Sequence, residues 1–575
     1  MKSYKYIFLA ALAISVASCE KTLEENPKYT INNVTAFESE ETANMVLMGC
    51  YAFLTDYNAY GQAIQETVVG PTGLIFGQNN NVNYVEFASL NVTETNGTIG
   101  QVWSGYYKVI SECNYFISSL EKSSLSTEYK NQALGEAKFI RALCYFNLAN
   151  LFGGVPLRLD PTNSDNINMS RPSREDVYKL VEEDWIFAAE HLSANKISGR
   201  ASKYAAYAYL TKLYWTLGSL DNTPSSPYWA KAKETGDIVL TSGGFDLESN
   251  FANLFKVYSV NSPESIFQIN FSSSTNGFGN RGNWIFSASN SSNPGISWAR
   301  YRASKPYYDH FRGTYPDDPR LEATFGTKIK LIKTNGNILY TYPYYYTTAN
   351  ANTVIADSVD YSVAPDPTNP SVDVLSEVLK TNFINSGSRD FGWPFFIKQF
   401  DASATAQNSK KNLMIYRYAD FLLIMADVEN ELRPNNPLAL TYLNKVLNRA
   451  RTSKANAIYP KAVSAGISQN QLREMIFNER LFELAGEFDM FMDVRRRGVE
   501  FFKKVIDRHD NHHITKAQVL FNKSAGNNLS FMDYLILDGI NDVNDFLKKN
   551  LLLPIPRNEI SNNEGISDTD QNYGY

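Results

Sequence analysis

Apolar residues recur at helical spacing through two long stretches of this chain, and this periodicity limits its fold more than any other feature. In residues 102–120, Trp103, Tyr106, Ile110 and Ile117 fall on one face of a helix. Similar patterns occupy residues 39–54, 128–152, 201–217, 229–240, 416–432, 437–452 and 469–497. Helices of this kind must bury their apolar faces against one another. We therefore predict a mostly α fold.

Successive predicted helices pair at intervals of roughly 30–45 residues, which is the range of helix-pair repeats such as the tetratricopeptide repeat. Alanines at contact positions, among them Ala137, Ala142, Ala205 and Ala208, allow neighbouring helices to approach closely. The predicted architecture is therefore a series of tetratricopeptide-like helix pairs.

The middle of the chain has a different character. Between residues 249 and 412 the helical periodicity fades, and Gly, Asn, Ser, Thr and Pro become frequent. Residues 265–271 are typical of a short β-strand, and tyrosines cluster in residues 340–346. Long irregular segments on a rigid helical base are where binding surfaces usually lie. We predict a loop-rich, partly β middle region.

The N-terminus predicts export and lipid anchoring. Lys2 and Lys5 precede an apolar run of about eleven residues, which is shorter than the roughly 20 residues that cross a bilayer. The run ends in Val-Ala-Ser before Cys19, which resembles a bacterial lipobox with cleavage before Cys19 and lipidation of its thiol. An ordinary signal peptide with an incidental cysteine is the alternative. The predicted parts are a signal peptide (residues 1–18), a lipidated tether (19–35), an N-terminal helical part (36–248), and the loop-rich region with the C-terminal helices (249–575).

Composition narrows the classes of partner and cofactor. Lys and Arg total 54 against 60 for Asp and Glu, a formal net charge of −6, so we predict no nucleic acid partner. The chain has 5 His and 4 Cys without zinc or EF-hand spacing, and the cluster around His512 is interpreted as a solvated loop. We therefore predict no metal and no cofactor. Cys50, Cys113 and Cys144 are expected to be small buried side chains, with a Cys113–Cys144 bridge as the alternative.

Five ordered motifs resemble the signature segments of a known family. They are EAKFIRALCYF continuing to LFGGVPL (residues 136–157), RPS before VY (171–178), RYAD continuing to LLIMAD (417–427), ER with ELAGE and DVRRRG (479–498), and LLPIP before EI (552–560). Together with the lipobox, they make the chain similar to the SusD/RagB family of outer-membrane nutrient-binding lipoproteins. The resemblance covers nearly the whole mature chain.

This resemblance implies a fold, a location and a partner. The implied fold has four tetratricopeptide-like helix pairs that support a variable, loop-rich face. Similar proteins bind oligosaccharides, or in some branches peptides, and act as a hinged lid over a SusC-like TonB-dependent transporter. The acidic residues that follow Cys19 resemble the surface-export signals of such lipoproteins. The expected location is thus the outer membrane, facing outside, with the lipid anchor as the only contact with the bilayer.

Acidic residues in one motif raise the question of catalysis. Glu479, Glu483 and Glu487 are spaced at i, i+4 and i+8, which predicts one face of a helix. A glycosidase needs two carboxyl groups of this kind. However, Arg480 and the arginines at 495–497 lie in the same segment and can neutralise the acids. The pairs Glu136 with Arg141 and Arg417 with Asp420 are interpreted in the same way. We therefore expect a charge-paired framework and no catalytic residue.

A carbohydrate-binding face needs flat aromatic rings surrounded by polar side chains. A ring covers the C–H face of a sugar, while amide, carboxylate and guanidinium groups bind its hydroxyls. Aromatic residues in irregular segments are therefore better candidates than Trp103, Trp185, Trp215 and Trp229, which lie in predicted helices and are interpreted as packing residues. Residues 57–96, 277–301 and 340–346 fit this description. The candidate ligand-binding residues are Tyr60, Asn80, Asn83, Tyr84, Arg281, Asn283, Trp284, Trp298, Tyr344 and Tyr345.

The predicted function is capture of an oligosaccharide at the cell surface and its delivery to the transporter, without catalysis. A peptide binder with the same fold and partner is one alternative. A surface glycosidase and a scaffold that only assembles the transporter are two others. We expect replacement of both Trp284 and Trp298 by Ala to abolish glycan binding without changing the melting temperature. Because loop geometry decides which hydroxyls are contacted, the sequence does not name the glycan.

Overall fold

The computed structural model describes residues 36–77, 81–257, 262–271, 277–287, 298, 300–326, 394–404, 407–509 and 542–575. Four short strands between residues 329 and 355 are described by their backbone. The predicted signal peptide and tether, including Cys19, lie outside the described residues.

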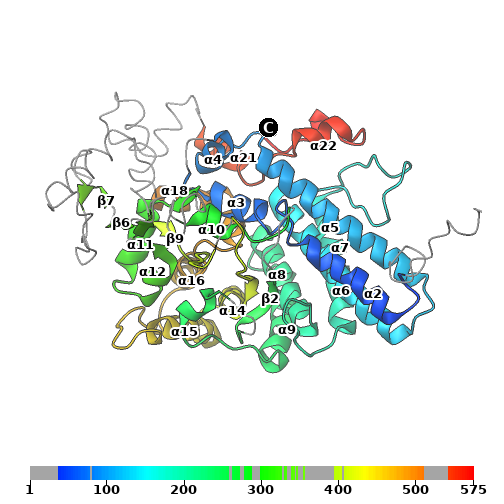
Figure 1. Ribbon diagram of the computed structural model, residues 1–575. Helices are drawn as coiled ribbons and strands as arrows, with labels where there is room; N and C mark the ends of the chain where they lie inside the picture. The colour runs from blue at the N-terminus through cyan, green and yellow to red at the C-terminus, as the bar shows by residue number, and fades with distance from the viewer. Residues whose placement is uncertain are drawn as a thin grey trace, which may run out of the picture.

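Long helices form the N-terminal part, and helices adjacent in the sequence pack against one another. They are α2 (Glu40–Phe53), α5 (Gly97–Glu121), α6 (Thr127–Phe152), α7 (Arg174–His191), α8 (Lys203–Asp221) and α9 (Pro227–Ser242). α5 packs on α6, α6 on α7, α7 on α8, and α8 on α9. Figure 1 shows α2, α5, α6 and α7 running side by side on the right of the molecule. The predicted series of helix pairs is confirmed.

The ends of these helices follow local rules of the sequence. Ser173 and Asp176 form a capping box at the start of α7. α6 ends at Gly153, whose φ of 78° is a backbone conformation that favours glycine. Gly154 is needed for a different reason, because a Cβ there would lie 2.0 Å from the carbonyl oxygen of Pro172. The two glycines therefore allow the chain to leave α6 and pass close to the segment before α7.

Aromatic side chains fill the spaces between the N-terminal helices. Trp185 packs against Tyr209 with ring centroids 5.0 Å apart and against Phe146 at 5.3 Å. The predicted packing tryptophans Trp103, Trp185, Trp215 and Trp229 are at most 5% exposed. The prediction that they serve packing is confirmed.

The C-terminal helices complete the fold. They are α14 (Tyr418–Leu432), α15 (Pro437–Thr452), α16 (Gln469–Glu483), α17 (Met490–Asp493), α18 (Val499–His509), α21 (Val543–Lys549) and α22 (Arg557–Asn562). α14 packs on α8 and α9 as well as on α15 and α16, so it joins the two helical parts. Its side chains are buried almost throughout, in keeping with this central position.

The prediction of a single helix over residues 469–497 is wrong. α16 ends at Glu483, and the chain turns through Gly486, whose φ is 74°. A Cβ at Gly486 would lie 2.8 Å from the ring of Phe396, so the turn also permits a close approach to strand β9. Glu487 therefore lies beyond the helix and not on the same face as Glu479.

The middle region contains short helices and two-stranded antiparallel sheets. The described sheets pair β1 (Ile75–Gly77) with β3 (Tyr301–Ala303), β2 (Ser265–Ile269) with β10 (Leu413–Arg417), β4 (Phe325–Gly326) with β9 (Phe395–Phe396), β5 (Ile329–Ile332) with β6 (Ile338–Tyr342), and β7 (Tyr345–Tyr346) with β8 (Val354–Ile355). The helices here are α10 (Gly282–Phe286), α11 (Lys305–Thr314) and α12 (Pro319–Thr324), with a 3-10 turn at Phe251–Phe255. Outside this region lie the short helices α3 (Ala63–Val69) and α4 (Val82–Ala88) and 3-10 turns at Gly70–Thr72 and Asp568–Asp570. The partly β middle region is thus confirmed, and its irregular stretches contain more short helices than the sequence predicts.

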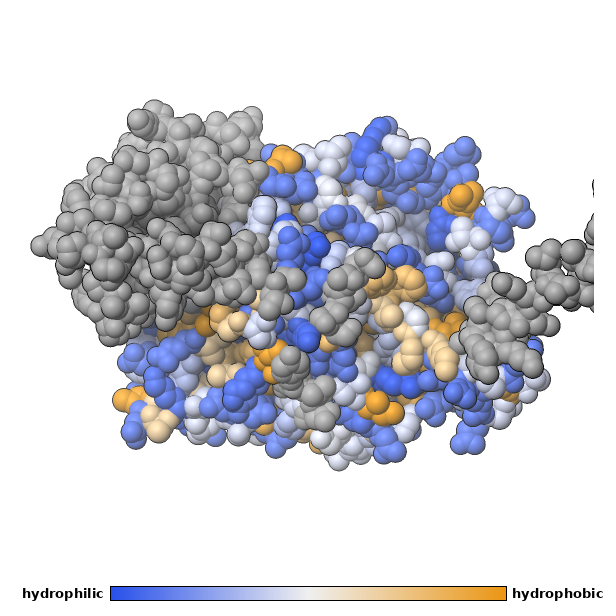
Figure 2. All heavy atoms as spheres, in the orientation of Figure 1, coloured by the Kyte–Doolittle hydropathy of each residue, from blue (hydrophilic) through white to orange (hydrophobic). Residues whose placement is uncertain are grey.

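The described surface seen in Figure 2 is mainly hydrophilic, with apolar residues gathered in small patches. Among the described helices, none combines the length and the apolar character that crossing a bilayer would require.

Candidate functional site

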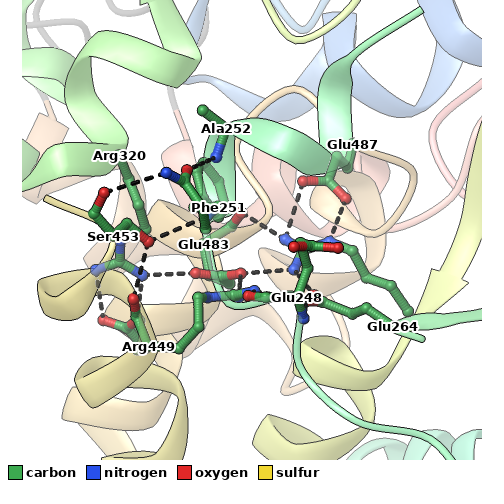
Figure 3. A network of polar contacts seen from close by, with 12 residues as sticks. Glu248, Phe251, Ala252, Glu264, Arg320, Arg449, Ser453, Glu483 and Glu487 are labelled. Carbon is green, nitrogen blue, oxygen red and sulfur yellow. Dashed lines mark hydrogen bonds and ion pairs between the residues drawn. The ribbon is translucent and has the colours of Figure 1, made fainter. Parts of the chain in front are cut away.

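The acids of the ELAGE motif lie in a network of buried ion pairs, part of which is shown in Figure 3. Arg417 binds Glu483 at 2.5 Å, Glu487 at 2.7 Å and Glu264 at 2.8 Å. Arg449, from α15, contacts Glu264 at 2.5 Å and also Glu483. These side chains are at most 9% exposed. They hold α15, α16 and strands β2 and β10 together and leave no access for a sugar.

The two helical acids of this motif differ in pKa. Burial raises the pKa of Glu479 to about 7, although Arg320 contacts it and lowers the pKa in part. Burial also opposes ionisation of Glu483, but Arg449 and Arg417 outweigh it and hold its pKa well below the usual range. A raised and a lowered carboxyl are the pattern of a glycosidase pair. Because both side chains are fully enclosed, this pattern reflects the framework, as predicted.

The arginines predicted to neutralise these acids bind other partners. Arg480 binds Asp420 at 2.6 Å and Asp493 at 2.7 Å. Arg497 binds Asp427 at 2.9 Å. Neighbouring residues on a helix point in directions about 100° apart, so Arg480 faces away from Glu479. The acids are instead neutralised by arginines from other elements.

The two other predicted pairs are also wrong in detail. Glu136 binds Arg200 at 2.6 Å, and Arg141 binds Asp184 at 2.8 Å. Residues 136 and 141 are five apart on α6, whereas helix neighbours are three or four apart. Arg417 lies at the end of β10 with extended backbone, so it points away from Asp420. All of these groups still serve the framework.

Two of the three segments predicted to form a ligand face meet in space. The backbone N–H of Tyr57 donates to the carbonyl of Gly277 at 2.8 Å, and that of Arg281 donates to the carbonyl of Gly61 at 2.8 Å. Strands β1 and β3 pair from Ile75 opposite Ala303 to Gly77 opposite Tyr301. Figure 1 shows α3 and α10 close to each other in the upper part of the molecule. Residues far apart in the sequence therefore form one cluster.

Arg281 lies at the centre of this cluster. Its guanidinium carbon is 3.5 Å from the centre of the Tyr57 ring and 5.1 Å from that of Trp284. Its Nη1 donates to Oε1 of Gln62 at 2.9 Å. The hydroxyl of Tyr57 donates to Oδ1 of Asn408 at 3.0 Å. Tyr57, Gln62, Arg281 and Asn408 are all half-buried, so they form a polar surface beside the aromatic rings.

Trp284 and Trp298 form an aromatic platform next to Arg281. Their rings meet edge to face with centroids 5.8 Å apart, and the N–H of Trp298 donates to the carbonyl of Trp284 at 2.9 Å. Trp298 is 44% exposed, whereas Trp284 is 6% exposed. On its buried side, Trp284 contacts the guanidinium of Arg300 at 3.7 Å, and Arg300 binds Glu66 at 2.6 Å. Trp298 is therefore the outer ring, and Trp284 supports it.

The remaining candidate residues occupy different places. Tyr60 is 1% exposed and accepts a hydrogen bond from Asn147, so its ring belongs to the interior. Asn283 is fully buried and accepts from the backbone N–H of Asp401, which makes it a support of the cluster. Tyr84 is 7% exposed and packs against Tyr301. Asn83 is half-buried and accepts from the N–H of Gly97 at 3.3 Å. Asn80, Tyr344 and the side chain of Tyr345 lie outside the described residues.

Sequence reasoning did not single out Tyr57, Gln62, Glu66, Arg300 or Asn408. Tyr57 and Arg300 lie inside the predicted segments, and Arg300 could have been found by asking which charged residues flank the tryptophans. Glu66 lies in an apolar helix that is buried on all sides, where an isolated acid implies a buried partner. Gln62 and Asn408 have no comparable signal, because their partners come from distant segments.

A separate cavity of about 790 Å³ opens between the ends of α8, α9, α16 and α18. Trp229 and Phe501 line it, but they are 1% and 8% exposed. In its wall, Arg473 and Arg497 both bind Glu431, at 2.6 and 2.7 Å. Because it lacks an exposed ring, this cavity does not have the features of a sugar platform.

Cys50, Cys113 and Cys144 are buried free cysteines, as predicted, and Cys113 and Cys144 are not bridged. The described residues hold no group of three or more His, Cys, Asp or Glu side chains arranged for a metal ion. The histidines at 512 and 513 lie outside the described residues.

The family models, curated relatives and solved structures that this chain resembles agree with one another. The model of the SusD family matches residues 263–575, and a model described as starch-binding and associating with the outer membrane matches residues 21–215. A SusD-like protein of Formosa agariphila, P25, is 25% identical over 516 residues, which cover 87% of this chain and 90% of that protein.

Solved structures share the fold. A SusD homolog from Bacteroides thetaiotaomicron superposes with a TM-score of 0.71 at 19% identity, covering 94% of this chain and 97% of its own. A laminarin-binding SusD-like protein superposes with a TM-score of 0.62 at 20% identity, covering 94% of this chain and all of its own.

Proposed function

This chain belongs to the SusD family, and we propose that it is a non-catalytic glycan-binding lipoprotein that captures oligosaccharides on the platform of Trp284 and Trp298. The observation that carries the proposal is the exposed ring of Trp298 beside the polar groups of Gln62, Arg281 and Asn408. A flat ring next to fixed hydrogen-bonding groups is what recognition of a sugar requires.

The platform is held in place before a ligand arrives. Backbone hydrogen bonds join residue 298 to Trp284 and Arg300 to Ile285, at 2.9 and 2.7 Å. Arg300 and Glu66 fix the inner face of Trp284. Holding the ring rigidly lowers the entropy that binding would otherwise cost. Weak stacking can therefore contribute to affinity.

The family models and the solved structures support the chemical class of the ligand. One family model is described as starch-binding and associating with the outer membrane, and one structural neighbour is described as laminarin-binding. Both descriptions concern polysaccharides. The enclosed state of Glu479 and Glu483 supports binding without hydrolysis by these acids.

Location and partner complete the proposal. Lipidation of Cys19 would anchor the protein in the outer membrane, and two or more acyl chains suffice for stable anchoring. The protein would face outside and pass its ligand to a SusC-like TonB-dependent transporter, which would supply the import path.

Titration calorimetry of the mature chain with oligosaccharides from a glycan array tests the function. Trp298→Ala should lower the affinity for the oligosaccharide roughly tenfold, because stacking of a sugar on an aromatic ring contributes on the order of 1 kcal/mol or more. Tyr573→Ala is the control, since Tyr573 is 51% exposed and lies in the C-terminal segment. Unchanged affinity in Trp298→Ala would remove the platform from the site, and capture of peptides alone would favour the peptide-binding alternative.

A further inference from the structure

Among the residues that the structure describes, the candidate site has one positive charge more than its carboxylates balance. Two guanidinium groups, Arg281 and Arg300, lie on Trp284 at 5.1 and 3.7 Å from its ring centre. Glu66 is the carboxylate in this cluster, and its Oε1 accepts from Arg300 at 2.6 Å. Glu66 also accepts from the side chain of Gln62. Oε1 of Glu66 thus accepts from Arg300 and Gln62, and its Oε2 accepts from the hydroxyl of Tyr301 at 3.3 Å. None of these hydrogen bonds involves Arg281.

Other nearby carboxylates are also occupied. Asp56 pairs with Lys108 at 3.2 Å. Asp401 accepts from the hydroxyls of Ser403 and Ser409 at 2.6 Å each and is 2% exposed. Among the described residues, none forms an ion pair with Arg281. Within the described part of the chain, the one hydrogen bond of its guanidinium goes to the neutral amide of Gln62.

The guanidinium of Arg281 is positioned in advance. The face of Tyr57 lies 3.5 Å from its carbon, and Tyr57 is itself fixed by Asn408. Stacking on an aromatic ring and an amide hydrogen bond keep a guanidinium in one orientation while leaving N–H donors for a ligand. Arg281 is half-buried, so water screens its charge less than that of an exposed arginine.

We propose that the site binds acidic oligosaccharides, in which a uronic acid carboxylate pairs with Arg281 while an adjoining sugar ring stacks on Trp298. This inference rests on the proposed function and names its ligand class. A planar carboxylate matches the two parallel N–H donors of a guanidinium, which neutral hydroxyls do not. Pairing would also neutralise the surplus charge of the cluster.

Titration of the mature chain with oligogalacturonides and with the same oligosaccharides after reduction of their carboxyl groups tests the inference. The two series differ only in the carboxyl group. Charge-assisted hydrogen bonds predict that the acidic series binds roughly ten- to a hundredfold more tightly. Oligosaccharides containing other uronic acids, each with its reduced counterpart, extend the panel beyond one sugar.

Variants separate the role of Arg281 from that of general charge. Arg281→Gln should remove the preference for the acidic series, so that the acidic and the reduced series bind with similar affinity. Lys410→Gln, which removes an exposed charge one residue from Ser409, is the matched control and should keep the preference. Rising salt should weaken the acidic series more than the reduced series.

The outcomes distinguish the inference from the function it rests on. Equal affinity for the acidic and the reduced series would overturn the acidic ligand class, and so would a preference for the acidic series that persists in Arg281→Gln. Neither result would contradict the proposed capture of glycans. If only neutral glycans bind on the array, the acidic ligand class is again overturned and the proposed capture of glycans is retained. Binding of acidic peptides without any oligosaccharide overturns both.

Discussion

The guanidinium carbon of Arg300 lies 3.7 Å from the centre of the Trp284 ring, and both side chains are buried. The same guanidinium binds Glu66 in α3 at 2.6 Å. One buried contact thus connects an N-terminal helix to the aromatic platform of the middle region. The platform depends on this connection for its position.

Glu66→Gln should weaken both the fold and the site, because it leaves the buried guanidinium of Arg300 without its counter-charge. Removing one partner of a buried ion pair costs about 3–5 kcal/mol. Urea unfolding measures the loss of stability, and near-ultraviolet circular dichroism reports the Trp284–Trp298 pair. Glu41→Gln, at an exposed position in α2, should change neither. A Glu66→Gln variant with native stability and an unchanged tryptophan signal would refute the positioning role.

Trp284→Ala should behave differently from Trp298→Ala. Trp284 is 6% exposed and packs against two guanidinium groups, so its removal leaves a cavity that costs about 3–5 kcal/mol. Trp298→Ala should cost less than about 1 kcal/mol, since its ring is 44% exposed. The expectation that the double substitution keeps the melting temperature is therefore replaced by a marked decrease. Thermal unfolding of the two single variants decides between these expectations.

Arg417→Met should destabilise the protein by about 3–5 kcal/mol or prevent folding, because Glu264, Glu483 and Glu487 would lose a shared buried partner. Arg433→Met is the matched control at an exposed position one residue after α14, and it should change stability by less than about 0.5 kcal/mol. Denaturant unfolding gives both values. Similar stability of the two variants would contradict the framework role of the motif.

Gly154→Ala should destabilise the protein by about 1–3 kcal/mol, since its Cβ would lie 2.0 Å from the carbonyl oxygen of Pro172. Gly100→Ala in α5 provides the opposite case, because no atom lies within 4 Å of the added Cβ. Alanine there should stabilise the helix by about 0.5–1 kcal/mol. Melting temperatures that move in the same direction for both variants would contradict this assignment.

Lys411→Met should raise stability most at acidic and neutral pH. Burial lowers the pKa of Lys411 to about 7, and the charge of Asp401 offsets this only in part. Between pH 7 and the usual lysine pKa, the unfolded chain binds a proton that the folded protein does not, so stability rises with pH in that window. Below pH 7 the folded protein carries the full cost of a buried charge. The advantage of Lys411→Met, measured by urea unfolding at pH 6, 8 and 10, should therefore shrink as pH rises. An advantage that is constant with pH would show that Lys411 is charged throughout.

Much of the fold could be predicted because helix formation depends on residues close together in the sequence. The periodicity of residues 437–452 predicts α15 with its observed ends, and Ser173 with Asp176 predicts the start of α7. The error over residues 469–497 has a local cause that is harder to recognise. Gly486 can continue a helix or turn out of it, and the nearby ring of Phe396 comes from a distant strand.

The candidate site was predicted less completely, since its contacts join segments more than 200 residues apart. The sequence indicates that residues 57–96 and 277–301 carry suitable side chains, and it names Arg281, Trp284 and Trp298 among them. It also names Tyr60 and Asn283, which the structure encloses. An aromatic or amide side chain in an irregular segment can point into the interior or toward solvent, and only its packing partners decide between the two.

The sequence by itself determined most of the long helices, their pairing and the family, because periodicity, caps and ordered motifs are properties of neighbouring residues. Tertiary structure alone decided which charges pair and which ring faces water. Arg417 pairs with three acids from two other segments and not with Asp420. Arg281 binds an amide, whereas Arg300 binds a carboxylate. The physical reason is that the strength of an ion pair depends on distance and burial, and both are set only when remote parts of the chain come together.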